Sequence, residues 1–325
     1  MSEINHTSVK ILADTRGING TRLTTFLVKF PRFIEPEILR HRSLSFSAAS
    51  SRAVNLEKHI EKVDKEYFIP KFTKDTKGMS AKEYLGGQEE GWATLAWGIA
   101  LNEVINASKE LLKWGVHKQH GSRLLQPFEY QEMIISGTEW ESFFDLRCPK
   151  YYIPGLDNEI YRSKLDVQYI VDKYELKGFN PDKHNKSEAQ PEIQHLAEIM
   201  WDLYNLSTPK TARVHLPFGY NNKYTLEENV ARNVAQCARI SYLSEVDDIK
   251  KDLLLYSKLK GSLHWSPFEH IAFAMDTDEW YDFTVKANFG DVATVQNGIC
   301  KNFRGFIQLR WFEELNLDCV KLYEI

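Results

Sequence analysis

The sequence contains little cysteine, no apolar run of membrane length and almost no excess of either charge. Its four cysteines lie far apart and include no Cys-x-x-Cys pair, which argues against a disulfide framework and a zinc knuckle. The formal net charge of -4 over 325 residues gives no reason to expect general binding to nucleic acid or to an anionic membrane. The first residues form no signal peptide, and no apolar stretch approaches roughly 18 to 20 residues. We therefore expect a cytoplasmic protein with no membrane or nucleic-acid partner.

Glycine-rich phosphate loops and clustered metal ligands are missing as well. Neither G-x-G-x-x-G nor G-x-x-x-x-G-K-[ST] occurs, which argues against a Rossmann-type cofactor site and a P-loop NTPase. His117 and His120 lie close together but have no further carboxylate or thiolate ligand in the pattern, so no metal site is predicted. Nucleotide or redox chemistry would need another scaffold.

The patterns that are present predict strands mixed with long helices. Residues 8–30 hold two β-branched runs separated by glycines, which is typical of an antiparallel hairpin. Glu35-Pro36 suits the start of a helix, and nothing interrupts that helix before Ser51. Without regular strand–helix alternation, the chain favours an α+β fold with a mixed or antiparallel sheet.

Further along the chain, helical patterns dominate. Apolar residues recur at helical spacing from 92 to 114, which predicts a long core helix, and Thr138 with Glu141 forms an expected capping box for a helix that ends at Arg147. Residues 148–188 show little periodicity, so we expect an insertion without a core of its own. Later segments predict helices near 189–204, 226–240 and 246–260, then a turn and strand at 261–276. We expect one domain over residues 1–325.

Residues 40–52, RHRSLSFSAASSR, are the most informative stretch. They combine Arg40, His41, Arg42 and Arg52 with several serines. Guanidinium and hydroxyl groups bind phosphate oxygens by charge-assisted hydrogen bonds, and an imidazole can face a flavin ring. Composition alone favours a solvated basic helix face.

The order of these residues closely resembles the signature RHRxxSxNxxSxR of the flavin-dependent thymidylate synthases. One position departs, because Ser47 stands where the family has Asn and so lacks the amide fork. A second segment, LLKWGVHKQHGSRLLQPFEY, is similar to a family helix that leads to a nucleotide-binding arginine, here Arg123. A third, SGTEWESFFDLR, resembles a family helix whose last arginine, here Arg147, activates the uracil ring. A fixed guanidinium stabilises the negative charge that develops on N3 and O4 when C5 becomes nucleophilic.

A fourth segment, CARISYLSE followed by LYSKLKGSLHWSPFEH, resembles the N-terminal flavin-binding block of compact family members. Here it follows the RHR motif instead of preceding it, which resembles a circular permutation. Permutation is tolerable because chain ends commonly lie close together at the surface. The closing NFRGFIQLR is shared with longer, phage-type members, but no role is assigned to Arg304 or Arg310.

The resemblance implies reductive methylation of dUMP with FAD as cofactor, NADPH and methylenetetrahydrofolate as co-substrates, and a homotetramer with shared sites. Catalysis is implied for Arg147. Substrate binding is implied for Arg40, Ser50, Ser51, Arg52, Arg123 and Arg147. Cofactor binding is implied for Arg40, His41, Arg42, Ser136, Thr138, Ser142, Ser241, His264, Ser266 and Glu269.

Two alternatives stay open. A related pyrimidine-nucleotide C5-modifying enzyme would act on another nucleotide or leave another one-carbon product. A non-catalytic nucleotide-binding protein would keep the basic side chains and bind no flavin. Covalent catalysis is not expected, because Ser50 has no evident positioned base and no cysteine stands in a catalytic position of a matched segment.

Overall fold

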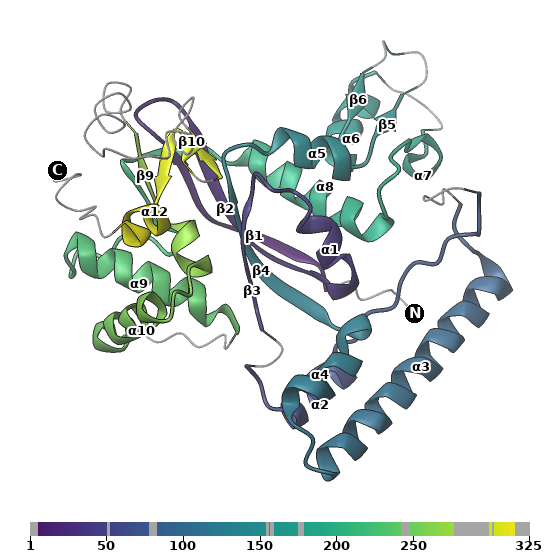
Figure 1. Cartoon of the computed structure of the whole chain (residues 1–325). Coiled ribbons are helices and arrows are strands. Elements are labelled where there is room, and N and C mark those ends of the chain that lie inside the picture. Colours follow the sequence, from purple (N-terminus) through teal and green to yellow (C-terminus); the bar gives the residue numbers. More distant parts are fainter. Residues whose placement is uncertain are drawn as a thin grey trace.

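The computed structural model describes residues 6–50, 53–77, 83–153, 156, 159–174, 179–241, 248–275, 299–300 and 302–315. Within them, strands and long helices form the α+β fold that the sequence predicted (Figure 1). A central sheet has the order β3-β4-β2-β1-β7, and a second sheet has the order β12-β9-β8. Helices cover both regions, and one helical group stands apart from the sheets.

The central sheet begins with the predicted hairpin. Strand β1 (Ser8–Arg16) pairs antiparallel with β2 (Arg22–Pro31), which pairs antiparallel with β4 (Tyr130–Gly137). Strand β3 (Ser45–Ala48) extends the sheet beyond β4, and the short β7 (Lys210–Thr211) pairs parallel with β1. The hairpin turn places Gly20 at φ +83°, a conformation that L-residues rarely adopt.

One face of this sheet is covered by helices on either side of the motif segment. A 3-10 turn, η1 (Arg32–Ile34), leads into the short helix α1 (Glu35–Ile38). Helices α5 (Glu141–Arg147) and α8 (Pro191–Leu206) pack nearby. Their apolar faces share one core cluster with β2 and β4, which includes Phe26, Phe30, Phe143 and Phe144. This cluster fixes α1 relative to α5, and the site described below lies between them.

The C-terminal part forms a second layer on the same sheet. Strands β8 (Val214–His215), β9 (Ala272–Ala274) and β12 (Phe306–Gln308) pair antiparallel. Around them lie α9 (Leu226–Ala238), α10 (Ile249–Gly261), α12 (Leu309–Glu314) and the 3-10 segments η3 (Arg239–Ser241) and η4 (Ser266–His270). Ile134 of β4 belongs to their core cluster, so the two halves share a continuous interior. A small ribbon, β10 (Ile299–Cys300) with β11 (Phe303–Arg304), lies beside them.

The hairpin turn also connects the two halves. Asn19 Nδ2 donates to the backbone oxygens of Met275 (2.8 Å) and Gly305 (2.7 Å). A side chain at Gly305 would lie within 2.5 Å of Thr21 Oγ1, and its φ is +67°. Only glycine fits there, so this contact depends on close backbone approach.

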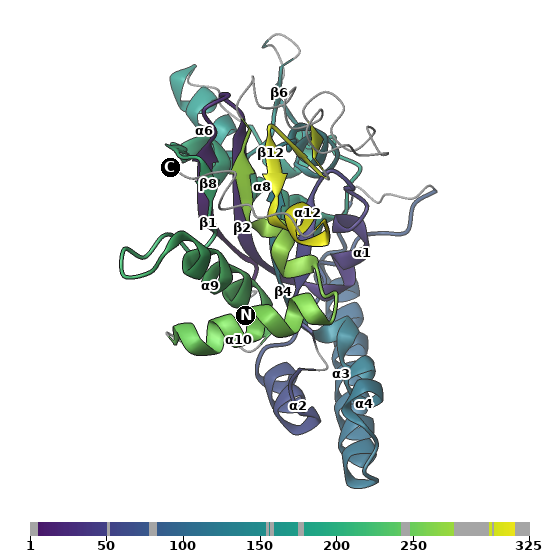
Figure 2. The ribbon, with the colours of Figure 1, turned by 60° about the vertical axis from the view of Figure 1, so that its left-hand side comes forward.

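The long helix α3 (Gly87–Lys113) confirms the expected helix but not its expected place in the core. It extends away from the sheets beside α2 (Leu56–Lys65) and α4 (Lys118–Leu124), as Figures 1 and 2 show. Leu101 and Ile105 pack into a small cluster with α2 and with the turn η2 (Gln126–Phe128). The exposed fractions of Trp92, Leu95 and Ile99 are 67%, 62% and 55%. Helical spacing identified an apolar face, but periodicity cannot show whether the same chain covers it.

The segment 148–188 differs from its prediction, because it has an apolar cluster of its own. Tyr151, Ile153 and Val167 are buried together, with other side chains packed against them. The elements are the strand pair β5 (Tyr151–Tyr152) and β6 (Ile160–Tyr161), and the helices α6 (Lys164–Lys173) and α7 (Pro181–His184). Aromatic and β-branched side chains supply this cluster without a strict period, so periodicity missed it.

Two local predictions were wrong. The helix from Pro36 ends at Ile38, and the motif continues as a turn and then as β3, because Ser45–Ala48 pairs with β4. The capping box also fails, since α5 has Trp140 as its N-cap residue without a side-chain cap bond. Thr138 Oγ1 instead accepts from the backbone N–H of Arg304 at 3.0 Å. In both cases a distant segment offers the hydrogen bonds that a local pattern had assigned to the helix. No helix among the described residues is long and apolar enough to cross a membrane.

Candidate active site

The RHR motif lies in the turn between α1 and β3. Arg40 and Arg42 are exposed, whereas His41 is buried between them. His41 faces inward because its imidazole contacts Arg147 and packs against Phe143, both of α5. Arg42 makes no ion pair with a described residue, so its guanidinium is available to an anion.

Glu37 brings two of the predicted arginines together. Arg147, the last residue of α5, donates from Nη1 to Glu37 Oε2 at 2.9 Å and from Nη2 to the backbone oxygen of Glu37 at 3.3 Å. Arg40 lies 3.1 Å from the other carboxylate oxygen. The side chain of Arg147 is 14% exposed and that of Arg40 is 68% exposed. One carboxylate therefore fixes a mostly buried guanidinium beside a solvated one.

His41 provides the second anchor of Arg147. Arg147 Nε donates to His41 Nε2 at 2.9 Å, and the imidazole packs edge-on against Phe143 at a centroid distance of 4.9 Å. Burial, and then the positive charge of Arg147, lower the pKa of His41 to about 4. The imidazole is therefore neutral at pH 7 and can accept this hydrogen bond, which a protonated ring could not.

Arg123 approaches the opposite end of α1. It is exposed near the end of α4, and its charge acts on Glu35. Burial raises the pKa of Glu35. The positive charges of Arg32 and Arg123 offset part of this rise, and the negative charge of Glu129 adds to it. When the side-chain amide of Gln126 is oriented with its oxygen toward Arg123, Arg123 Nη1 donates to that oxygen at 3.3 Å. The charge of Arg123 thus acts on the first residue of α1, and Arg40 and Arg147 pair with Glu37 in the same helix.

The C-terminal block meets the motif across a long separation in sequence. Ser47 Oγ lies 2.7 Å from Ser266 Oγ, although 219 positions separate the two residues. Glu269, three residues later, forms an ion pair with Arg310 at 2.5 Å. The structure therefore brings the first and fourth resembling segments side by side. Ser47, which replaces the family Asn, uses its hydroxyl for this contact.

Asn302 and Gln308 are polar residues of this region that the sequence did not single out. Both donate to Ser45 Oγ, at 3.2 Å and 2.8 Å respectively. The shared ending NFRGFIQLR marked their segment, but no spacing in that segment reveals a contact with a strand more than 250 positions away. The pairing of β12 with β9 places Gln308 there, and Asn302 lies in the turn between β10 and β11.

Two of the side chains predicted to contact the flavin form hydrogen bonds with other parts of the protein. Ser136 is fully buried, and its hydroxyl lies 2.6 Å from Thr25 Oγ1 and 2.8 Å from His270 Nδ1. Thr138 accepts from the Arg304 backbone. The complete burial of Ser136 does not support a direct flavin contact, whereas Thr138 is half-buried and its hydroxyl keeps an O–H as a donor.

The remaining predicted contacts lie in different surroundings. Ser142 lines an open hollow of about 740 Å³ together with Glu139, Glu141 and Asp145. The negative charges of these three carboxylates disfavour the binding of a phosphate there. His264 is exposed. Ser241 is the last residue of η3, and its side chain lies outside the described residues, as do Ser51 and Arg52. Ser50 ends the described part of the motif.

A buried polar chain connects the two sheets beneath this site. His215 bonds to Thr15 and Thr25, each at 2.7 Å, and Thr25 continues through Ser136 to His270. Burial lowers the pKa of both His215 and His270 to about 3. His270 Nε2 has no hydrogen-bond partner within the described part of the chain. Two neutral imidazoles thus join β1, β2 and β4 to β8 and η4.

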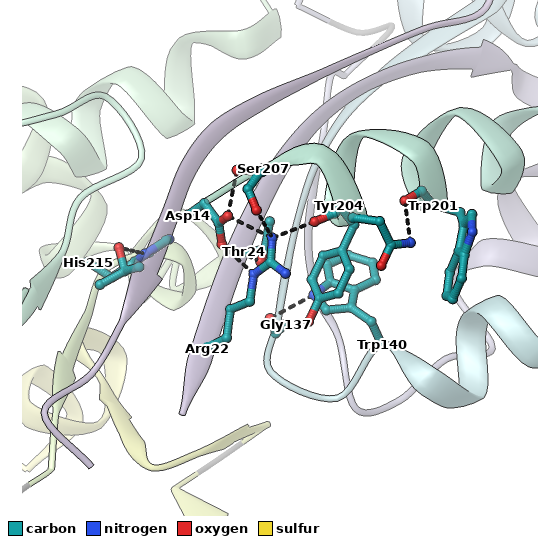
Figure 3. A network of polar contacts seen from close by, with 11 residues as sticks. Asp14, Arg22, Thr24, Gly137, Trp140, Trp201, Tyr204, Ser207 and His215 are labelled. Atoms are coloured by element: carbon teal, nitrogen blue, oxygen red, sulfur yellow. Dashed lines mark hydrogen bonds and ion pairs between the residues drawn. The ribbon is translucent and has the colours of Figure 1, made fainter. Parts of the chain in front are cut away.

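A separate polar network holds the hairpin against the end of α8 (Figure 3). Asp14 accepts from Arg22 Nε at 2.8 Å, from Thr24 and from Ser207, and the Arg22 guanidinium lies 3.7 Å from the centre of the Tyr204 ring. Burial alone would raise the pKa of Asp14, but the hydrogen bonds from Arg22, Ser207 and Thr24 and the charge of Arg22 lower it overall. This network stabilises the fold and lies on β1 and β2, with β4 between these strands and β3.

Comparison with known proteins bears on the motif half of the chain. A family model described as Thymidylate synthase complementing protein matches residues 22–210, more than half of the chain. No curated protein sequence matches. The matched range contains Arg40, Arg123 and Arg147.

Two solved structures from Streptomyces cacaoi are similar at low identity. One is a UMP/dUMP methylase PolB bound with 5-Br dUMP, at 18% identity and TM-score 0.39, covering 56% of this chain and 65% of that chain. The other is PolB bound with 5-Br UMP, at 16% identity and TM-score 0.42, covering 62% and 89%. This chain spans less than two thirds of the first PolB chain, and such TM-scores carry over no feature of its site. By the match over residues 22–210, the chain belongs to the family of thymidylate synthase complementing proteins, the flavin-dependent thymidylate synthases.

Proposed function

We propose that this protein methylates C5 of dUMP to give dTMP, with methylenetetrahydrofolate as carbon donor, NADPH as reductant and FAD as cofactor. One observation carries the proposal: Arg147 is held by Glu37 and His41 directly beside the solvated Arg40 of the RHR motif. A mostly buried guanidinium next to an exposed one suits a ligand that has a polar ring and a phosphate.

Arg147 has capacity left for a substrate. A guanidinium carries five N–H groups, and the contacts with Glu37 and His41 use three of them. The others could donate to N3 and O4 of a uracil as negative charge develops there. Because the anchors are in place before the substrate binds, little reorganisation is needed in the transition state. Arg40 and Arg42 would hold the phosphate, and Arg123 would contact the nucleotide from the other end of α1.

The protein residues fit a flavin in part. Exposed Arg40 and Arg42 suit its phosphates, whereas the carboxylate-lined hollow beside Ser142 does not. FAD, when bound, would supply the hydride that reduces the transferred carbon to a methyl group. The contact of Ser47 with Ser266 supports our proposal that the C-terminal block serves this site in permuted order within a single domain.

The described cysteines are poor candidates for a nucleophile. Cys148 follows Arg147 in sequence, but its thiol is buried and donates to the backbone oxygen of Ala197 at 3.5 Å. Burial raises the pKa of the thiols of Cys148 and Cys237, so neither is a thiolate at neutral pH. Of the cysteines, these two have described side chains, and neither is suited to form an adduct, which supports our proposal that the activation depends on arginine.

We expect the purified protein to be yellow, with flavin absorbance that NADPH bleaches in the absence of air. With methylenetetrahydrofolate present, it should release tritium from C5-labelled dUMP. Parallel assays with UMP and dCMP, read by product mass, test the related C5-modifying activity that the Ser47 departure leaves open. A colourless protein that binds dUMP without tritium release would instead support a non-catalytic nucleotide-binding protein.

We also propose that a second copy of this chain covers the exposed face of α3. Residues 91–101 carry no charged side chain, and Trp92, Leu95 and Ile99 follow one another at helical spacing in solvent. In sedimentation velocity, the wild type should be oligomeric. The triple variant Trp92→Glu, Leu95→Glu and Ile99→Glu should sediment as a smaller species with lower activity, because charge in an apolar interface is costly.

A matched control is Leu254→Glu on α10, where a leucine is 57% exposed outside this face. That variant should sediment like the wild type. Unchanged sedimentation of the α3 variant would show that this face is not an interface, and a fully active monomeric wild type would refute a shared site.

A further inference from the structure

Two residues of the closing segment converge on Glu269. Gln308, the last residue of β12, donates from Nε2 to the backbone oxygen of Glu269 at 3.1 Å. Arg310, in the first turn of α12, donates from Nη1 to the carboxylate of Glu269 at 2.5 Å. One short segment therefore holds both the backbone and the side chain of the same residue.

The same segment also holds the motif strand. Gln308 Nε2 donates to Ser45 Oγ at 2.8 Å, and Gln308 is 1% exposed. A buried amide without partners would destabilise the fold, so its two hydrogen bonds specify one arrangement of β3 and η4. Gln308 is thus a bridge between the RHR motif and the segment that carries Ser266 and Glu269.

The charges around Arg310 favour a positioning role over direct binding of an anion. Its guanidinium contacts Glu269 and, from Nε at 2.9 Å, Glu314. These contacts engage all three nitrogens of the guanidinium, with Nη2 lying 2.8 Å from Glu314, so Arg310 is committed to carboxylates of the fold. Hydrogen bonds to both carboxylates raise the pKa of Arg310 against the effect of its burial, and the ion pairs therefore persist at all pH values at which the carboxylates are ionised.

We propose that Gln308 and Arg310 are positioning residues that orient Glu269 for flavin binding, with Gln308 also fixing the motif strand β3 beside it through Ser45. This inference rests on the proposed function, which assigns the C-terminal block to the flavin site, and on the family resemblance, which implies Glu269 as a flavin ligand in that block. It adds residues outside the matched range 22–210 to the set that the site requires.

The test measures the dissociation constant of FAD by flavin fluorescence for full-length variants that are stripped of flavin and then reloaded. Arg310→Gln should weaken FAD binding about tenfold, the size of one lost charge-assisted contact. Arg310→Lys should lie between it and the wild type, because it keeps the charge and loses the planar fork. Arg304→Gln is the matched control from the same segment. Its exposed side chain pairs with Glu139, and FAD binding should not change.

A double-variant comparison separates positioning from a general loss of structure. If Arg310 acts through Glu269, adding Arg310→Gln to Glu269→Gln should weaken FAD binding no further. Additive losses, or an Arg310→Gln protein that binds FAD like the wild type, would overturn the inference while leaving the proposed function intact. A wild type that binds no FAD would refute both. If Arg310→Gln does not fold, FAD binding is compared in the same way for Arg310→Lys alone and combined with Glu269→Gln.

Discussion

Replacing Arg147 with alanine should lower the rate of tritium release from C5-labelled dUMP by about 100-fold to 1,000-fold, the usual effect of removing one preorganised donor from a developing oxyanion. The arginine is anchored by Glu37 and His41 before any ligand arrives. Its loss removes charge stabilisation that no other described guanidinium provides at this position. The turnover number should therefore fall more than the affinity for dUMP, because the proposed site also binds dUMP through Arg40 and Arg123.

Glu37→Gln tests the anchor itself. The amide keeps the shape of Glu37 but loses the charge that holds Arg40 and Arg147, so we expect an intermediate loss of turnover. Arg162→Ala is the control, because Arg162 pairs with Glu141 and Asp145 of the same helix α5 and stacks on Trp201. It should leave the turnover unchanged. Full activity of Arg147→Ala would disprove the assignment of Arg147.

Buried neutral histidines should make the protein sensitive to mild acid. His41 has a pKa of about 4, and His215 and His270 have pKa values of about 3, whereas an unfolded histidine titrates near pH 6.5. Between these values the unfolded chain binds a proton that the folded chain does not. The contribution is fully present above pH 6.5 and is lost as pH falls toward the folded pKa. Each histidine should cost about 2 kcal/mol of unfolding free energy between pH 7 and pH 5.

Single-histidine variants isolate this effect from the carboxyl groups. Burial raises the pKa of Glu35, Glu198 and Asp202, so these groups act in the opposite direction as pH falls. In urea titrations at pH 7 and pH 5, His270→Phe should lose about 2 kcal/mol less than the wild type over this range, because phenylalanine keeps the ring and cannot be protonated.

A second variant and a control complete the comparison. His41→Gln should show the same reduced loss between pH 7 and pH 5. Asn233→Ala removes a buried side chain that does not titrate, so it should lower stability at both pH values and keep the wild-type difference between them. An equal pH 7-to-5 loss in the wild type and in His270→Phe would contradict a neutral buried imidazole at this position.

Local sequence patterns predicted much of the fold where local forces decide it. The hairpin of β1 and β2, helix α8 and helices α9 and α10 lie where periodicity and turn residues placed them. The motif segment was wrong as a helix because its backbone bonds go to β4, a strand more than 80 positions later. Local propensity is weak against such pairing once apolar side chains are buried with it.

By itself, the sequence determined which side chains are available: the arginines and serines of the motif, Arg123, Arg147 and the SPFEH segment, whose order carries the family resemblance. The tertiary structure alone decided which of these residues meet. It placed Glu37 between Arg40 and Arg147, Ser47 against Ser266, and Gln308 between Ser45 and Glu269. It also buried Ser136 with His270. The reason is physical: a residue type fixes what a group can donate or accept, but its partner depends on long-range packing of the strands and helices that carry both.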